Sequence, residues 1–264
     1  MTDATRNTAD VGLVTIATGR YIEFVPALIA SAREHLLGLG PVFVLTDAEA
    51  VEADGDVTIL SWGRMEWPLP TLLRYRAFTQ YAQALSSVDV LLYTDADMLF
   101  VGDVDVRDAS GLIAVRHPGF ASAARADFPY EHRAASRAFV PKDRGTAYFC
   151  GGVQGGRTSS YLAAAVAIDA GIADDQARGI TATWHDESHW NRYLIDHPAD
   201  LALGADYCTP DVQRSGSSRI LAITKDHASV RELTPMQRVQ YVVSRVRYSL
   251  QLRLRRLSSR RHRR

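Results

Sequence analysis

Apolar segments alternate with amphipathic segments along the first half of the chain. The mainly apolar runs at residues 11–17, 41–47 and 56–62 predict buried strands. Residues 22–37 and 71–85 predict helices, because the latter repeats apolar side chains at helical spacing and the former is long and largely apolar. Residues 88–100 predict a fourth strand and residues 112–117 another. This alternation predicts an α/β domain with a mostly parallel, Rossmann-like sheet flanked by helices.

The pattern loosens from about Gly119. The segment up to residue 148 predicts a long loop, which in a compact domain usually serves function. Helices are predicted from about Thr158 to Gly171 and again from near Asp186. Four glycines in CGGVQGG, residues 150–156, predict a tight bend or a close approach to a ligand. Their spacing matches neither the dinucleotide-binding fingerprint nor the Walker pattern.

Composition places the chain among globular proteins. Its 264 residues, 47% of them hydrophobic, suffice for one large domain or two small ones. The two cysteines, Cys150 and Cys208, give no disulfide framework and no zinc spacing, which favours a reducing compartment. No apolar run approaches the roughly 20 residues of a membrane span, and the polar start lacks the apolar part of a signal peptide. We therefore expect a cytoplasmic protein whose residues 1–10 are disordered.

A net charge of zero conceals two oppositely charged parts. Ten of the 30 lysines and arginines lie in residues 234–264, which contain no acid. Residues 1–233 therefore hold 30 acids against 20 bases, a net charge of −10, and the tail carries +10. We expect residues 11–233 to form the folded domain and residues 234–264 to be a chemically separate tail.

Two aspartates, Asp95 and Asp97, stand where the fourth predicted strand ends. Ligands of open α/β sheets bind outside the carboxyl ends of the strands, and residues i and i+2 of a strand face the same way. Such a pair can offer oxygens to a hard divalent cation that substrate phosphates complete. An EF-hand loop beginning at Asp95 is excluded, because Phe100 and Val106 replace the required Gly and Glu. A solvated aspartate pair at a turn is the alternative.

A second polar cluster lies in ATWHDESHWNRYL, residues 182–194. Tryptophans beside carboxylates suit a sugar site, since indole stacks on the apolar face of a pyranose and carboxylates accept hydrogen bonds from its hydroxyls. Helical zinc-protease patterns do not match. Two alternatives stay open: acids favoured at a helix N-terminus by the dipole, and a metal shared by His185 and His189, for which spacing marks no third ligand.

Four segments in order resemble glycosyltransferase family 6, the family of the histo-blood-group A and B transferases and α-1,3-galactosyltransferase. They are YTDADM, RHPGF, the stretch from FPYEHR to VQGG, and WHDESHWNRYL, within about residues 11–232. The resemblance implies a GT-A fold and retaining transfer of GalNAc or Gal from a UDP-sugar, in α-1,3 linkage, onto a β-galactoside-type glycan. A retaining enzyme of another DxD family, or a non-catalytic nucleotide-sugar- or glycan-binding protein, is the alternative.

The resemblance also implies where the metal and the reacting centre lie. Asp95-Ala96-Asp97 matches the DxD motif, which holds Mn²⁺ against the UDP diphosphate. Some bacterial members replace both acids by asparagine and work without metal; this chain keeps them, so we expect dependence on Mn²⁺. Glu187 matches the carboxylate beneath the anomeric carbon, where an anion stabilises oxocarbenium character. Covalent attack by Glu187 and same-face displacement both stay open.

Other contacts are implied by the same match. Donor contacts are implied for Ala17, Thr18, Tyr21, Arg74, Cys150, Gly151, Gly152, His185, Asp186, Lys225 and Arg231, and acceptor contacts for His117 and Trp184. Arg74 would pair with the metal-site acids and the donor, whereas Lys225 and Arg231 belong to a segment that closes over the diphosphate. For these three, a solvated helix or tail charge is the alternative. Gly152 leaves room for an N-acetyl group, and Cys150 replaces a bulkier residue, which favours UDP-GalNAc over UDP-Gal.

The tail lies beyond the resemblance. Apolar residues recur at helical spacing, with arginines largely elsewhere on the wheel: Val239, Val243, Val246, Leu250, Leu254 and Leu257. A basic amphipathic helix is typical of binding to a membrane surface, and anionic lipid attracts each nearby Lys or Arg by about 1 kcal/mol. No specific nucleic-acid partner is expected, because the helix lacks interleaved aromatic platforms; an RNA-binding or disordered tail is the alternative. We expect peripheral attachment to the inner face of the membrane.

Co-sedimentation with liposomes tests the tail. We expect the full chain to pellet with anionic vesicles and a chain ending at residue 233 to stay in the supernatant, because the truncation removes ten arginines. Vesicles of neutral lipid serve as the control. Equal pelleting of the two chains would contradict membrane binding by residues 234–264.

Overall fold

The computed structural model describes residues 10–226 and residue 230. The amphipathic helix expected at 234–264 and nearly all of the disordered start expected at 1–10 lie outside the described residues and stay predictions. The chain divides into one unit that ends at Thr224 and a second that begins at Lys225. The fold described below is that of the first unit.

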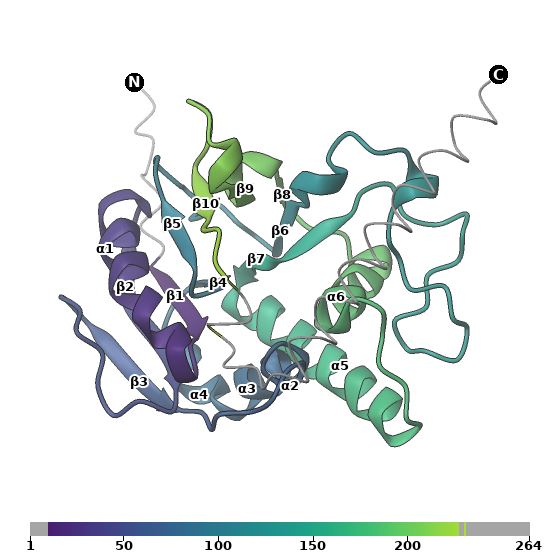
Figure 1. Ribbon diagram of the computed structural model, residues 1–264, viewed down its shortest axis with the longest axis horizontal. Helices are drawn as coiled ribbons and strands as arrows, with labels where there is room; N and C mark the ends of the chain where they lie inside the picture. The colour runs from purple at the N-terminus through teal and green to yellow at the C-terminus, as the bar shows by residue number, and fades with distance from the viewer. Residues whose placement is uncertain (1–9, 227–229, 231–264) are drawn as a thin grey trace. The chain divides into compact units, whose positions relative to one another are not determined.

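The larger sheet has seven strands in the order β3-β2-β1-β4-β7-β6-β8 (Figure 1). They are β1 (Val11–Ile16), β2 (Leu39–Thr46), β3 (Val57–Ser61), β4 (Val90–Thr94), β6 (Leu112–Arg116), β7 (Phe149–Arg157) and β8 (Leu201–Leu203). Strands β3, β2, β1 and β4 pair in parallel, and so do β6 and β8. Strand β7 is antiparallel to both of its neighbours, β4 and β6. The predicted α/β class with a mostly parallel sheet is confirmed.

The chain passes from the larger sheet to a smaller sheet between Asp95 and Asp97. The smaller sheet contains β5 (Met98–Phe100), β10 (Ile220–Ala222) and β9 (Thr209–Pro210). The Asp95 amide donates to the Gly152 carbonyl of β7 at 2.8 Å, whereas the Asp97 carbonyl accepts from Ile223, just past β10, at 2.9 Å. The single strand predicted for residues 88–100 is therefore wrong, because the backbone exchanges one set of partners for another at residues 95–97.

Helices pack on both faces of the larger sheet. They are α1 (Val25–His35), α2 (Leu69–Leu72), α3 (Arg74–Gln80), α4 (Ala82–Leu85), α5 (Thr158–Ala177) and α6 (His185–Asp196), and the short 3₁₀ turns are η1 (Gly19–Phe24), η2 (Pro118–Phe120), η3 (Arg125–Asp127), η4 (Ala205–Cys208) and η5 (Asp211–Gln213). In Figure 1, α2, α3, α4 and α5 lie below the sheet and the smaller sheet lies above it. The central strands β1 and β4 are consequently buried on both sides.

Three helix predictions need correction at their ends. The helix expected at 22–37 begins at Val25, because Pro26 suits the first turn of a helix and η1 precedes it. The helix expected at 71–85 divides into α2, α3 and α4, although i→i−4 hydrogen bonds such as Ala77 to Leu73 at 3.0 Å continue across the divisions. The helix expected to end near Gly171 continues to Ala177.

Alternate residues of the central strands enter two different cores. Leu13 and Leu92 pack into the core that contains α1, whereas Val14 and Leu91 pack into the core that contains α3, α5 and α6. All four side chains are fully buried. This two-sided burial explains why β1 and β4 read as continuous apolar runs rather than as alternating ones.

The glycine-rich segment forms strand β7, so the predicted bend is wrong. A Cβ atom at Gly155 would clash with the Leu91 carbonyl of β4, and one at Gly156 would clash with the Gly111 carbonyl beside β6. These two glycines therefore allow β7 to lie close to its neighbouring strands, and they do not serve the approach of a ligand. Gly151 and Gly152, at the start of the strand, lie beside site residues instead.

The loop predicted after Gly119 is confirmed, with η2 and η3 as its short turns. Its Glu131 is 2% exposed and accepts hydrogen bonds from Arg133 and from the Thr183 amide, the latter at 2.9 Å. Burial opposes ionisation, but the donors from Arg133 and Thr183 outweigh it and lower the pKa of Glu131 to about 2. An ionised, buried carboxylate thus ties the loop to the segment that precedes α6.

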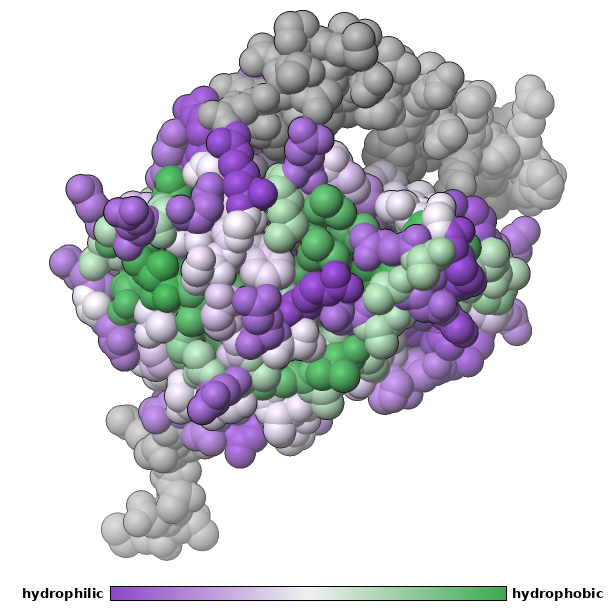
Figure 2. All heavy atoms as spheres, turned by 90° about the horizontal axis from the view of Figure 1, so that it is seen from below, coloured by the Kyte–Doolittle hydropathy of each residue, from purple (hydrophilic) through white to green (hydrophobic). Residues whose placement is uncertain are grey.

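The surface in Figure 2 carries small groups of apolar residues separated by polar ones. Few large apolar side chains of the described residues are exposed, and only Trp67 and Leu69 among them are close together in the sequence: Leu37, Trp67, Leu69, Val166 and Val212. Within the described part of the chain, no helix combines the length and the apolar character needed to cross a bilayer.

Candidate active site

The predicted donor residues that belong to the first unit converge on one edge of the larger sheet. Strands β1 and β4 are parallel neighbours, so Ala17 and Thr18 after β1 lie at the same edge as Asp95 after β4. Because β7 is antiparallel to β4, its first residues come to this edge too, as the pairing of Thr94 with Val153 requires. Ala17 and Ala96 are buried at this edge, and Tyr21 lies in η1.

Arg74 links three of these segments. It is the first residue of α3, is 2% exposed and donates to the Gly151 carbonyl. Its Nη2 donates to Asp95 Oδ1 at 3.1 Å, and its Nη1 lies 3.2 Å from Asp186 Oδ2. The guanidinium carbon also lies 4.2 Å from the centre of the Tyr93 ring. Arg74 is therefore a buried link within the site and not an exposed helix charge.

Around the Arg74 guanidinium, carboxylates outnumber positively charged groups. Burial disfavours the charged guanidinium, but Asp186 and Asp95 keep the pKa of Arg74 well above its ordinary value. Asp95, Asp186 and Glu187 interact electrostatically with one another as well as with Arg74. With its acids ionised, the site has a net negative charge.

Asp95 and Asp97 have different surroundings. Asp95 Oδ1 accepts from Arg74 and from the Tyr93 hydroxyl at 2.6 Å, whereas no described residue donates a hydrogen bond to its Oδ2. The Asp97 residue is 8% exposed. Both belong to the turn between β4 and β5, so the strand-face argument that places i and i+2 together does not apply to them. Within residues 10–226, no three His, Cys, Asp or Glu side chains form a ready metal cluster.

Glu187 lies in the first turn of α6, and both of its oxygens are held. Oε1 accepts from the Tyr148 hydroxyl at 2.8 Å, and Oε2 accepts from the Gly151 amide at 2.8 Å. Burial among these groups raises the pKa of Glu187 to about 7, although the hydrogen bonds from Gly151 and Tyr148 oppose the rise. The carboxylate is consequently fixed in orientation, and its pKa lies above that of an ordinary glutamate.

Asp186, the neighbouring residue, has a buried oxygen without a hydrogen bond. It is 3% exposed, and its Oδ2 has no hydrogen-bond donor although Arg74 Nη1 lies 3.2 Å away. Burial, together with the charges of Asp95 and Glu187, raises the pKa of Asp186 to about 7 against the effect of Arg74. A buried acceptor left without a donor is costly unless a ligand supplies one.

The remaining residues of the second motif surround the start of α6. Trp184 precedes the helix, and its amide donates to Ser188 Oγ at 2.9 Å. His185 has a positive φ of 52°, the left-handed region that side chains other than glycine rarely adopt. Its ring meets the edge of Trp67, which is 42% exposed, with centroids 5.3 Å apart. Strain of this kind concentrates at functional sites.

His117 and the start of β7 complete the edge. His117 Nδ1 accepts from the Gly119 amide at 3.0 Å, and burial lowers the pKa of this imidazole to about 4. Cys150 is a buried free thiol. A Cβ atom at Gly152 would lie 2.8 Å from Met98 Cε and 3.0 Å from Asp95 Oδ2, so Gly152 borders Asp95 directly.

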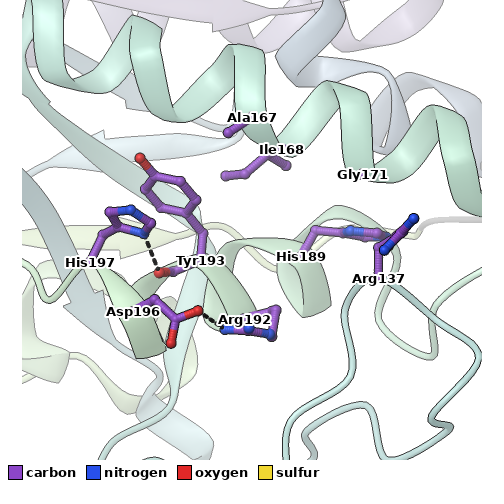
Figure 3. A pocket seen from close by; sticks show the side chains of 9 residues that line it. All are labelled: Arg137, Ala167, Ile168, Gly171, His189, Arg192, Tyr193, Asp196 and His197. Atoms are coloured by element: carbon purple, nitrogen blue, oxygen red, sulfur yellow. Dashed lines mark hydrogen bonds and ion pairs between the residues drawn. The ribbon is translucent and has the colours of Figure 1, made fainter.

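His189 faces a different part of the molecule from His185. It lines a cavity of about 240 Å³ between α5 and α6, where it points towards Arg137 (Figure 3). Its Nε2 lies 3.6 Å from Asp175, and burial lowers its pKa to about 4. This arrangement gives no support to a metal shared by His185 and His189.

The sequence analysis missed Tyr93, Asn191 and Tyr148. Tyr93 lies two residues before Asp95 at the end of a strand, and Asn191 lies four residues after Glu187 on a helix, so spacing could have revealed both. Tyr148 reaches Glu187 across 39 residues and left no local signal. Lys225 opens the second unit and Arg231 lies outside the described residues, so their lid role stays a prediction.

Comparison with known proteins gives consistent matches. The sequence profile described as Glycosyltransferase family 6 matches residues 3–232. The Histo-blood group ABO system transferase 2 of Rattus norvegicus is 31% identical over 246 residues, which cover 86% of this chain and 72% of the relative. The Globoside alpha-1,3-N-acetylgalactosaminyltransferase 1 of Homo sapiens is 30% identical over 212 residues, 76% of this chain and 61% of the relative.

A bacterial protein is also similar. The O-antigen biosynthesis glycosyltransferase WbnI of Escherichia coli is 24% identical over 210 residues, covering 76% of this chain and 88% of the relative. The family profile spans the larger sheet, the smaller sheet and every described residue of the candidate site. The chain therefore belongs to glycosyltransferase family 6 and is a retaining glycosyltransferase with an α/β fold of the GT-A type.

Proposed function

We propose that this protein transfers GalNAc, with Gal as the alternative, from a UDP-sugar in α-1,3 linkage onto a β-galactoside-type glycan. The observation that carries the proposal is the Glu187 carboxylate, held at both oxygens beside the buried Arg74–Asp95–Asp186 network. Two relatives support it through their printed names, which specify an ABO blood-group transferase and a globoside α-1,3-N-acetylgalactosaminyltransferase.

A divalent cation at Asp95 and Asp97 fits the charge of the site. The diphosphate of the donor is an anion, and it meets an edge where carboxylates already outnumber Arg74. Asp95 Oδ2, which accepts no hydrogen bond from a described residue, is an oxygen of the kind that Mn²⁺ and Mg²⁺ bind. The protein would supply few ligands and the diphosphate the others. A bound cation offsets charge on the departing UDP.

Glu187 acts on the opposite side of the reacting bond in this proposal. Cleavage of the sugar–phosphate bond develops positive character at the anomeric carbon, which a fixed anion stabilises. The Tyr148 hydroxyl and the Gly151 amide keep the Glu187 carboxylate in one plane, so it needs little reorganisation during the reaction. Covalent attack and same-face displacement both use this placement.

Asp186 and its neighbours contact the donor sugar in the same proposal. The Asp186 Oδ2 atom, buried without a hydrogen-bond donor, can accept from a sugar hydroxyl and so recover the cost of its burial. His185 lies next to it, held in a strained conformation against Trp67. Trp184 and His117 would contact the acceptor, while Lys225 and Arg231 would close over the diphosphate.

The start of β7 bears on donor choice. Gly152 has no side chain at a point bordered by Met98 and Asp95, and the small Cys150 lies two residues before it. The absence of a larger side chain at either position favours the larger N-acetyl sugar, UDP-GalNAc, over UDP-Gal.

Replacement of Glu187 tests the reacting centre. We expect Glu187→Gln to lower turnover by at least about 100-fold, because an amide cannot offer the negative charge that stabilises the transition state. UDP binding, measured by calorimetry with Mn²⁺, should persist. Glu34→Gln is the matched control, since the Glu34 side chain is 73% exposed. Near-normal turnover of Glu187→Gln would refute the assignment.

Removal of metal tests the DxD motif. We expect excess EDTA to abolish transfer and added Mn²⁺ to restore it, because the diphosphate otherwise meets uncompensated carboxylates. Asp95→Asn should weaken the Mn²⁺-dependent binding of UDP, whereas Asp103→Asn, a change at a 70% exposed side chain, should not. Turnover that continues undiminished in EDTA would contradict metal dependence.

Gly152→Ala tests the steric account of donor choice. The new methyl group would press on Met98 and Asp95 and narrow the space for an N-acetyl group. We expect the ratio of kcat/KM for UDP-GalNAc to that for UDP-Gal to fall by about 10-fold or more. Gly63→Ala is the control, because a Cβ there has no atom within 4 Å. An unchanged ratio, with both donors impaired equally, would instead indicate displacement of Asp95.

A further inference from the structure

Tyr148 contacts the proposed reacting centre from a distant part of the chain. It immediately precedes β7, is 2% exposed, and donates its hydroxyl to Glu187 Oε1 at 2.8 Å. The hydrogen bond thereby connects the loop that ends at residue 148 with the first turn of α6.

The Tyr148 ring is fixed by other rings of that loop. We call these five residues the aromatic cluster: His117, Phe120, Phe128, Tyr130 and Tyr148. Within it, the centroid of the Tyr148 ring lies 5.4 Å from Phe120, 5.5 Å from Tyr130, 5.9 Å from His117 and 6.4 Å from Phe128. Aromatic pairs at these separations attract one another beyond simple burial. The phenol oxygen is therefore held in place by packing on several sides.

The orientation of Glu187 needs two donors. The terminal torsion of a glutamate side chain is broad, so the plane of its carboxylate rotates readily unless both oxygens are held. The Gly151 amide holds Oε2 and the Tyr148 hydroxyl holds Oε1. If the Tyr148 hydroxyl is lost, one oxygen loses its donor and the plane can turn about the bond to Gly151.

We infer that Tyr148 is a positioning residue for the Glu187 carboxylate, and that the aromatic cluster couples the loop carrying His117 to the reacting centre. The inference rests on the proposed role of Glu187. Tyr148 itself acts through Glu187, so its loss should reduce the rate of the chemical step more than the binding of the donor.

The charges around Glu187 define a second readout. Arg74 of α3 favours the ionised carboxylate, whereas Asp95 after β4 and Asp186 of α6 disfavour it. The Tyr148 hydroxyl donates to the ionised form and so lowers its pKa. Removal of this donor raises the pKa of Glu187, and activity that needs the ionised form is then lost at a higher pH as the solution is acidified.

The test compares a phenol deletion in the aromatic cluster with one outside it. Tyr148→Phe removes the hydroxyl that contacts Glu187, whereas Tyr81→Phe, between α3 and α4, removes one that donates to the Ser61 carbonyl. We expect Tyr148→Phe to lower kcat by about 10- to 100-fold, the loss of one hydrogen bond to a charged group. The KM for the UDP-sugar should stay nearly constant, and the acid limb of the kcat profile should move to higher pH. Tyr81→Phe should change neither.

Thermal unfolding and a double variant complete the experiment. If Tyr148 acts through Glu187, adding Tyr148→Phe to Glu187→Gln should cause no further loss of turnover. A normal kcat and pH profile in Tyr148→Phe would overturn the inference, as would equal losses of Tm and activity in both phenol variants. If Glu187→Gln itself is fully active, the proposed function of Glu187 fails; if it is inactive while Tyr148→Phe is normal, only the positioning role fails.

Discussion

The buried guanidinium of Arg74 is the interaction on which the candidate site depends. It binds the Gly151 carbonyl, Asp95 and Asp186, which come from the start of β7, the end of β4 and the start of α6. Without this cation, two carboxylates would face each other in a poorly hydrated space and their repulsion would oppose folding. Because the cation balances only part of the acidic charge, the edge that it holds together remains attractive to further positive charge.

Burial at this edge has two effects at once. It raises the pKa values of Asp186 and Glu187 to about 7, and it strengthens the electrostatic interactions that fix these groups. The low local dielectric disfavours ionisation of these carboxylates. It also strengthens their electrostatic stabilisation of a developing positive charge once they are ionised. The loop after β6 contributes to this environment, since Glu131 binds it to the segment before α6 and Tyr148 of the aromatic cluster binds it to α6.

The sequence reveals the fold class and most elements of the site, but not how the elements switch partners. Buried strands and helices were predictable because their apolar periods differ. The break after Thr94 was not, since residues 90–94 and 98–100 are equally apolar and only pairing with β7 or β10 separates them. Family motifs identified Arg74 and Glu187, whereas the contact between Tyr148 and Glu187 depends on packing between segments 39 residues apart.

Strand β7 runs against its neighbours, so its first residues, and not its last, lie at the ligand edge. One side of the candidate site is therefore formed by a strand of the sheet rather than by a loop, although the Gly151 peptide binds Glu187 and Arg74 instead of a neighbouring strand. Under the proposed function, exchange of a small side chain on this strand alters the room for a sugar while the pairing of the rest of β7 with β4 and β6 stays intact. Sugar preference can in this way change without a new backbone arrangement.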